Sequence, residues 1–254
     1  MKLLIDAGNT RIKWAFVNAA GDWLRSGVLP VGQASELPSL FADSPELLQM
    51  SALQQIWVSN VAGEEVARHI RNIAAGQPTR PRFVVAQETQ CGVRNGYANA
   101  AKLGSDRWAA LIAAWHLVHG KCLVVNCGTA TTIDTLSGLG EFLGGLILPG
   151  VELMQRSLTD ATDQLKSIYV EPEMGKYAQF PQNTVDAMFS GAIQAGCGAI
   201  QRQHALLGNA GAPVVLSGGA AEVLRGHLRN LPLRVVDNLV LQGLLLISQE
   251  SKTR

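Results

Sequence analysis

The sequence predicts an α/β fold made of two related halves, and two observations lead to this prediction. Short apolar runs with the length of buried strands alternate along the chain with segments in which apolar residues recur at helical spacing. In addition, LLIDAGNTRIKWAF, which begins at Leu3, aligns without a gap with LVVNCGTATTIDTL, which begins at Leu123. Both segments read as a strand, an Asp or Asn, a glycine and a second strand, which indicates a duplicated strand–turn–strand unit.

The first half of the chain supplies most of the predicted strands. We expect antiparallel strands at 2–6, 11–18 and 23–30, because turn residues such as Ala20-Gly21-Asp22 separate these runs. Two further strands are expected at 55–61 and 82–86, and helices within 35–53 and at 63–75. The stretch 89–104 is rich in glycine and asparagine and predicts a loop.

The second half repeats this alternation. A helix is expected to begin at Ser105 or Asp106 and to end at Gly120, followed by a strand at 121–126. In GGLILPG, glycine and proline let a strand turn into a helix, and VVLSGGAAEVL (214–224) is again an apolar strand, glycines and a helix. Two halves of this kind would present their tight turns to a shared cleft.

Composition excludes several classes of function. The formal net charge is +1 and there is no run of Lys or Arg, so neither nucleic acid nor an anionic membrane is indicated as a partner. No apolar stretch approaches the roughly 20 residues that span a bilayer, and Asp6 interrupts the N-terminal apolar run early for a signal peptide. Four cysteines without CxxC spacing indicate buried thiols in a reducing compartment. We therefore expect a cytoplasmic protein that acts on small molecules.

The paired turns suit the binding of phosphate. Gly8 and Gly128 permit backbone conformations in which successive amides point into one concavity. Asn9, Thr10, Thr129, Thr131 and Thr132 add side-chain donors. Asp6 would repel a phosphate unless a divalent cation lies between them, so we expect it to hold magnesium through water. The alternative is an Asx turn at Asp6 that only caps its own hairpin.

Other phosphate motifs are absent from the sequence. There is no GxxxxGK[ST] and no GxGxxG between a strand and a helix. Gly218 and Gly219 do follow a strand and open a helix, which suits a backbone that passes close to a flat ring or a phosphate.

The acid at the start of the predicted helix has two readings. Ser105 or Asp106 in GSDRW can cap the helix, which is worth about 1 kcal/mol. Alternatively, Asp106 is a general base that takes the proton of an acceptor hydroxyl, while Arg107 holds an anionic group of the substrate or the transferring phosphoryl group. Residue types alone do not separate these readings.

Five motifs together resemble one family. DAGNTRIKW, NGYANAAKLGSDRW, VVNCGTATTIDTL, GGLILPG and LSGGAA stand in this order from residue 6 to residue 221. As an ordered set they resemble the type III pantothenate kinases, which include the proteins named Bvg accessory factor and belong to the acetate and sugar kinase/Hsp70/actin superfamily. The resemblance implies a duplicated ribonuclease H-like (actin-like ATPase) fold around a nucleotide cleft, with halves at 1–102 and 103–254, and a homodimer. It also implies ATP-dependent phosphorylation of pantothenate to 4′-phosphopantothenate, the first step toward coenzyme A.

The resemblance also assigns roles to individual residues. Asp106 matches the catalytic base and Asp6 the acid on the magnesium side. The phosphate contacts would be Gly8, Asn9, Thr10, Lys13, Gly128, Thr129, Ala130 and Thr131, and the pantothenate contacts would be Tyr97, Gly104, Ser105, Asp106 and Arg107. Thr184 resembles a threonine that reaches the substrate of a partner subunit.

Asn126 departs from the family pattern. Members that require a monovalent cation usually carry Asp at this position, and an amide oxygen is a weaker ligand for potassium or ammonium than a carboxylate. Cation dependence is therefore weakened or lost, or another ligand substitutes.

Two other functions stay open, namely a kinase for another small hydroxylated acceptor and a non-catalytic accessory protein that retains the nucleotide site. A binder needs no base, so the presence of both Asp6 and Asp106 favours catalysis.

Overall fold

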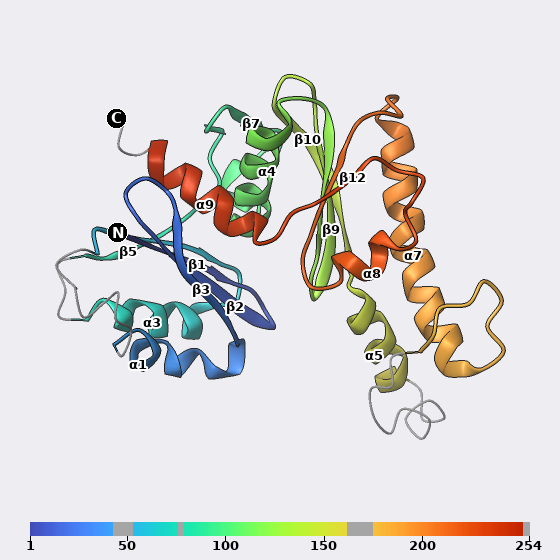
Figure 1. The fold of residues 1–254 in the computed structure, drawn as a ribbon, viewed down its shortest axis with the longest axis horizontal. Helices are drawn as coiled ribbons and strands as arrows, with labels where there is room; N and C mark the ends of the chain where they lie inside the picture. The colour runs from blue at the N-terminus through green and yellow to red at the C-terminus, as the bar shows by residue number, and fades with distance from the viewer. Residues whose placement is uncertain (43–52, 76–78, 162–174, 251–254) are drawn as a thin grey trace. The chain divides into compact units, whose positions relative to one another are not determined.

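The computed structural model describes residues 1–42, 53–75, 79–161 and 175–250, whose elements are shown in Figure 1. Contacts between residues divide the chain into two compact units, and each is described by itself. Unit 1 comprises Met1–Leu117 together with Asn238–Arg254, and unit 2 comprises Val118–Asp237. The predicted halves at 1–102 and 103–254 concern the duplication of the chain and stay a prediction.

Unit 1 is built on a five-stranded sheet with the order β3-β2-β1-β4-β5. The strands of this sheet are β1 (Lys2–Ala7), β2 (Arg11–Val17), β3 (Trp23–Pro30), β4 (Gln55–Asn60) and β5 (Pro81–Phe83). Unit 1 also contains β6 (Thr89–Gln90) and β7 (Val93–Asn95), which are not part of this sheet. Its helices are η1 (Val31–Glu36), α1 (Leu37–Ala42), α3 (Glu64–Ile73), η3 (Ala100–Lys102), α4 (Ser105–Val118) and α9 (Leu239–Glu250). The first three strands are antiparallel, and β4 and β5 run parallel to β1.

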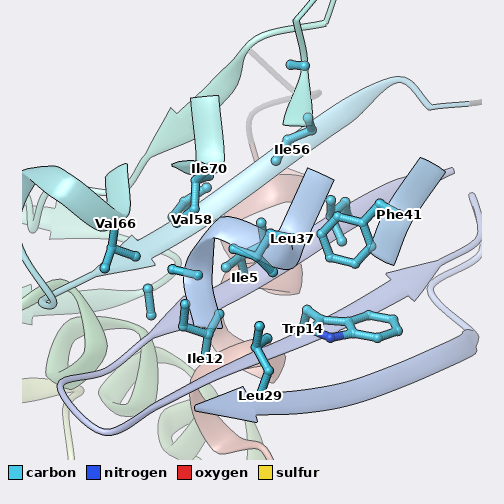
Figure 2. Packing of buried hydrophobic residues seen from close by; sticks show 14 of the residues in the cluster. Ile5, Ile12, Trp14, Leu29, Leu37, Phe41, Ile56, Val58, Val66 and Ile70 are labelled. Atoms are coloured by element: carbon cyan, nitrogen blue, oxygen red, sulfur yellow. The ribbon is translucent and has the colours of Figure 1, made fainter. Parts of the chain in front are cut away.

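The core of unit 1 lies between this sheet and the helices α1 and α3, as Figure 2 shows. Successive side chains of a strand point to opposite faces, so Ile5 of β1 lies in this core while Asp6 lies on the other face. Val66 and Ile70 of α3 are one helical turn apart and cover the sheet. Phe41 of α1 meets Trp14 edge to face, with ring centroids 5.1 Å apart.

The opposite face of the sheet carries α9, which packs on β1, β2 and β4. α9 also crosses α4 closely, because a Cβ on Gly243 would lie 1.9 Å from the carbonyl oxygen of Ala109. At the start of β1, the buried ammonium of Lys2 donates to the hydroxyl of Ser248 on α9 (2.6 Å). These contacts place α9, the last helix of the chain, in the first unit.

Unit 2 has a sheet in which the strands follow the order β12-β11-β8-β9-β10. Its strands are β8 (Cys122–Cys127), β9 (Ala130–Leu136), β10 (Glu141–Pro149), β11 (Val214–Ser217) and β12 (Leu233–Val235). Its helices are α5 (Val151–Ala161), α7 (Thr184–Leu206) and α8 (Ala221–Arg225). Buried residues of β8, β9, β11 and α7, such as Val125, Leu216 and Ile193, form its core.

The two units share one strand topology. In each, three antiparallel strands are followed by two strands that run parallel to the first. Two hydrogen bonds after the fourth strand also correspond, from the amide of Val61 to the carbonyl of Ala7 (3.0 Å) and from the amide of Ala220 to that of Cys127 (3.1 Å). The predicted duplication is therefore visible in the backbone.

The gapless alignment of the two hairpins is wrong by one residue after the turn. In β1–β2 the amide of Gly8 donates to the carbonyl of Arg11, whereas in β8–β9 the amide of Gly128 donates to that of Ala130 (both 3.0 Å). The second turn is thus one residue shorter. As a result Lys13, which lies opposite Asp6, corresponds to Thr132, which lies opposite Asn126.

The loop expected at 89–104 is also wrong in part. Its first residues form the antiparallel hairpin β6–β7, and Ala100–Lys102 form a short 3-10 helix. The glycine at the turn of the hairpin has a φ of +77°, which only glycine adopts readily. This glycine, Gly92, is evident in the sequence as a turn residue, but strands of two or three residues are too short for their alternation of apolar and polar residues to be detected.

Two other expectations concern burial and membrane spans. The thiols of Cys122, Cys127 and Cys197 are buried as expected, whereas the expectation is wrong for Cys91, which is half-buried. Burial raises the pKa of Cys122 and Cys127 to about 12. Across the described ranges, each helix falls short of the length or the apolar character that crossing a bilayer would demand.

Candidate active site

A row of three polar side chains crosses the middle of the unit 1 sheet. Asp6 of β1 pairs with Lys13 of β2 on one side and with Ser59 of β4 on the other. Paired residues of neighbouring strands lie about 5 Å apart and point to the same face. The predicted magnesium-side acid therefore stands between a cation and a hydroxyl at the end of the strand.

The carboxyl group of Asp6 is destabilised in its charged form. Burial, followed by the negative charge of Asp106, raises its pKa from 3.8 to about 7, and the nearby charge of Lys13 only partly opposes this rise. Two carboxyl groups that repel each other in a partly buried place are suited to share a cation. Both predicted acids belong to unit 1, and the charge of Asp106 contributes to the raised pKa of Asp6.

Asp106 lies in the first turn of α4, where its side chain is held by the local backbone. Its Oδ1 accepts a hydrogen bond from the amide of Arg107 (2.8 Å). A Cβ on Gly104 would lie 2.6 Å from the same oxygen, so a larger residue at 104 would displace the carboxylate. Asp106 therefore bonds to the start of its helix, and its charge also acts on Asp6; its role as a general base stays a prediction.

Arg107 and Tyr97 form a second pair beside this turn. The guanidinium of Arg107 is buried, donates to the hydroxyl of Tyr97 (2.9 Å) and lies 5.7 Å from the centre of its ring. Tyr97 is itself held by a bond from its amide to the side chain of Asn95 (3.0 Å). The structure thus groups the residues predicted to contact pantothenate around the start of α4.

The turn of the first hairpin offers exposed donors. Asn9 and Thr10 are exposed, and Lys13 is half-buried. The amide of Gly8 is used inside the turn, and its φ is not in the left-handed region. The predicted cradle therefore depends on the residues that follow Gly8 rather than on the amide of Gly8.

Three segments of unit 2 meet at the second predicted phosphate turn. A Cβ on Gly150 would lie 2.2 Å from the carbonyl oxygen of Gly128, and one on Gly218 would lie 2.4 Å from that of Cys127. Gly218 also has a φ of +102°, and the amide of Gly150 donates to the carbonyl of Thr129 (2.8 Å). Gly150 and Gly218 are therefore glycines because backbone passes directly against backbone.

The equivalent row in unit 2 carries no charge. Asn126 of β8 lies between Thr132 of β9 and Ser217 of β11 at the same register as the row in unit 1. Thr132 and Ser217 are buried and Asn126 is half-buried. The predicted position for a monovalent cation thus consists of an amide and two hydroxyl groups.

Other predicted site residues of unit 2 lie along the same turn or apart from it. Thr131 is buried beside Cys127, Ala130 is half-buried and Gly219 is exposed. Thr184 is the exposed first residue of α7, after Asn183, whose side chain caps the helix. Nothing in the described part of unit 2 joins Thr184 to the phosphate turn.

The fit of the unit 1 site to a magnesium ion can be judged from its acidic residues. Among the described residues there is no group of three or more His, Cys, Asp or Glu side chains that could hold a metal. Magnesium is commonly held by one or two carboxylates while phosphates and water complete its shell. The raised pKa of Asp6 beside Asp106 fits such a site, because a cation would relieve the repulsion.

Sequence patterns do not reveal two residues that shape the site. Ser59 stands in the sequence only as part of a strand, although the polar pair that ends the apolar run QIWVSN is a signal that could have found it. Gly150 is evident in the sequence as a turn residue, and only the structure shows its contact with Gly128.

Comparison with known proteins identifies close relatives. A family model described as type III pantothenate kinase matches residues 2–205. A protein of that name from Nitrosospira multiformis is 45% identical over 252 residues, which cover 98% of this chain and 91% of the relative.

Solved structures show the same fold at lower identity. A protein described as a Baf family transcriptional activator from Campylobacter jejuni superposes with a TM-score of 0.59 at 21% identity, covering 99% of this chain and all of its own. A protein described as a 2-dehydro-3-deoxygalactonokinase from Sinorhizobium meliloti gives 0.59 at 15% identity, covering 100% of this chain and 99% of its own. These similarities confirm the predicted fold class, a duplicated α/β fold shared with sugar kinases.

Proposed function

The chain belongs to the type III pantothenate kinase family, and from this premise we propose that it transfers the γ-phosphoryl group of ATP to the primary hydroxyl of pantothenate. The product would be 4′-phosphopantothenate, on the route to coenzyme A. One observation supports this function above the others. The charge of Asp106 contributes to the raised pKa of Asp6, which supports a base for the acceptor near an acid for the metal.

Asp106 is the proposed general base. Its carboxylate accepts the proton of the pantothenate hydroxyl as the oxygen bonds to the γ-phosphorus, and the bond from that phosphorus to the bridging oxygen breaks to release ADP. The amide of Arg107 and the absence of a side chain at Gly104 keep the carboxylate in place. Positioning of this kind is the main catalytic demand of phosphoryl transfer.

Arg107 and Tyr97 are proposed to hold the acceptor. A buried guanidinium binds a carboxylate strongly, and pantothenate carries one carboxylate. Tyr97 orients the guanidinium through its hydroxyl and ring. The backbone of Gly104 and Ser105 would border the same group, since the hydroxyl of Ser105 bonds to Ser59. Thr184 of a partner subunit is assigned to it only by family resemblance.

Asp6 is proposed to hold magnesium through water. When bound, magnesium neutralises phosphate charge and aligns the phosphoryl group for transfer. Lys13 beside Asp6 adds a positive charge to the same region. Asn9 and Thr10, with Gly8, would bind phosphate in unit 1, and Gly128, Thr129, Ala130, Thr131, Gly218 and Gly219 would do so in unit 2.

A homodimer and a cytoplasmic location complete the proposal. Leu143, Leu146 and Ile147 of β10 expose 60%, 41% and 65% of their surface, which is unusual for neighbouring large apolar residues. A second copy of the chain would cover them. Potassium or ammonium is proposed as a weak activator at Asn126, where hydroxyl and amide oxygens stand in for a carboxylate.

The two alternative functions receive less support. The family comparison does not favour a non-catalytic accessory protein, and such a protein would not need a base beside Asp6. A kinase for a hydroxylated acceptor without a carboxylate would not need a buried arginine to bind one.

A coupled assay of ADP release tests the function directly. We expect turnover that requires ATP, magnesium and pantothenate together, with only slight stimulation by potassium. ATP turnover that is equal with and without pantothenate would contradict the proposed acceptor. A panel of hydroxylated carboxylates, with pantothenol as the neutral analogue, would then show whether Arg107 selects the carboxylate.

A further inference from the structure

Two buried hydroxyl groups join the sheet of unit 1 to the helix that carries Asp106. The Oγ atoms of Ser59 on β4 and Ser105 on α4 are 3.0 Å apart. Ser59 is fully buried and Ser105 is 8% exposed. A buried hydroxyl is unfavourable without a partner, so each of these side chains depends on the other.

The position of this pair relates it to the two acids. Ser59 lies directly beside Asp6 in the parallel register of β1 and β4. Ser105 immediately precedes Asp106 in the first turn of α4. The hydrogen bond therefore connects the strand position next to one carboxylate with the helix position next to the other.

A second side-chain hydrogen bond holds the first turn of α4, but it leads to β6 and not to the strands that carry Asp6 and Ser59. The indole of Trp108 donates to the side chain of Gln90 on β6 (2.8 Å), which fixes the helix to the short hairpin. The carboxylate of Asp106 itself is bonded within its own turn, to the amide of Arg107. Its distance from Asp6 consequently follows from where the whole turn lies, and the hydroxyl pair attaches that turn to β4.

We propose that Ser59 is a positioning residue, which sets the place of Asp106 relative to Asp6 through its hydrogen bond to Ser105. The inference rests on the proposed role of Asp106 as the base and adds the residue that holds this base in register. Removing the bond lets the first turn of α4 shift. A misplacement of about 1 Å can cost on the order of a hundredfold in rate.

Single and double variants test the proposal. Ser59→Ala, Ser105→Ala and the double variant are each expected to lower kcat by about 10- to 100-fold, with little change in the dissociation constant of ATP. The double variant should lose no more than either single variant, because all three lack one and the same bond. If Ser105 instead contacts the substrate, Ser105→Ala will lose more than Ser59→Ala and will raise the KM for pantothenate, which would overturn the proposal.

Ser248→Ala is the matched control. Ser248 is also fully buried in unit 1 and bonded to a side chain on the sheet, but at the far end of β1. This variant should lose stability while kcat stays unchanged. Equal losses of melting temperature in Ser59→Ala and Ser248→Ala, with unchanged kcat in both, would show a purely structural bond and overturn the proposal.

Hydrogen exchange gives a readout that does not require activity. In Ser59→Ala we expect faster exchange at the amides of Arg107 and Trp108 relative to Ala113, deeper in α4, and no such change in Ser248→Ala. Unchanged relative exchange in the first turn would overturn the inference even if the wild-type protein phosphorylates pantothenate.

A wild-type protein without pantothenate turnover would instead contradict the proposed function, and exchange would still decide the role of Ser59. Ser105→Ala removes the same bond from the helix side and decides the question if Ser59→Ala does not fold.

Discussion

The two sheets present the same three positions with different chemistry. In unit 1 the row is Lys13, Asp6 and Ser59, and in unit 2 it is Thr132, Asn126 and Ser217. The backbone around both rows is alike, down to the hydrogen bonds that follow the fourth strand. Only the first row carries formal charge.

This difference separates the scaffold from the chemistry. A partly buried acid beside a second acid is unfavourable for folding, as the raised pKa of Asp6 shows. Unit 2 forms the same sheet without that cost. We therefore relate the charged row of unit 1 to the proposed catalysis. Both rows contain a serine at the same register, and Ser59 is the one that bonds to Ser105.

The largest effect on activity is expected from replacing Asp106, the second acid of unit 1, which has no counterpart in the polar row of unit 2. Asp106→Asn should lower kcat by about 10²- to 10⁴-fold while ATP still binds, because an amide cannot accept the proton. Steady-state kinetics and calorimetry of ATP binding measure the two effects. Undiminished kcat would remove Asp106 from the role of base.

The charge of the first row should make stability depend on pH. In the protein without nucleotide and magnesium, the folded state holds a proton on Asp6 up to about pH 7, whereas the unfolded state loses it near 3.8. The folded state thus binds more protons between these values, so the free energy of unfolding falls as pH rises from about 4 to about 7, by at most about 4 kcal/mol.

Asp6→Asn turns the first row into a closer match to the second and is the control for this slope. The variant should lack this part of the pH dependence, be more stable than the wild type at pH 8 and lose magnesium-dependent turnover. Urea unfolding at a series of pH values measures the difference. Equal slopes in the two proteins would show that Asp6 titrates near its ordinary pKa.

Two equivalent positions after the third strand test how closely each turn is packed. The amide of Gly150 bonds to Thr129 as that of Val31 bonds to Thr10, yet only unit 2 has glycine there. A Cβ on Gly150 would meet the carbonyl of Gly128 at 2.2 Å, so Gly150→Ala should cost about 1–3 kcal/mol or more. Val31→Ala is the matched control, with a smaller loss expected on denaturation. A stable Gly150→Ala variant would show that the second turn can move away.

The smallest effect is expected from adding charge to the second row. Asn126→Asp supplies a carboxylate to the amide and hydroxyl oxygens, and should strengthen activation by potassium by up to about tenfold in apparent affinity, or about 1.4 kcal/mol. Initial rates at increasing potassium, with sodium as the control, measure this change. Strict potassium dependence in the wild type would show that another ligand replaces the missing carboxylate.

Part of this molecule could be predicted from its sequence because the signals are local. The apolar runs that become β1, β4, β8 and β11 are continuous, and the turns between strands carry glycine and asparagine. The repeated Asp-x-Gly and Asn-x-Gly segments are enough to indicate the duplication. The short hairpin β6–β7 could not be predicted in the same way, because two residues give no periodicity.

The sequence by itself determined the fold class and the family, because strand patterns, turn residues and motif order are carried by neighbouring positions. The roles of Asp6 and Asp106 stay predictions. Only the tertiary structure decided the one-residue difference between the hairpins, the return of α9 to the first sheet and the bond between Ser59 and Ser105. These features depend on register and on close approach between segments far apart in the chain. Such distances are set by packing of the whole unit, which no local pattern specifies.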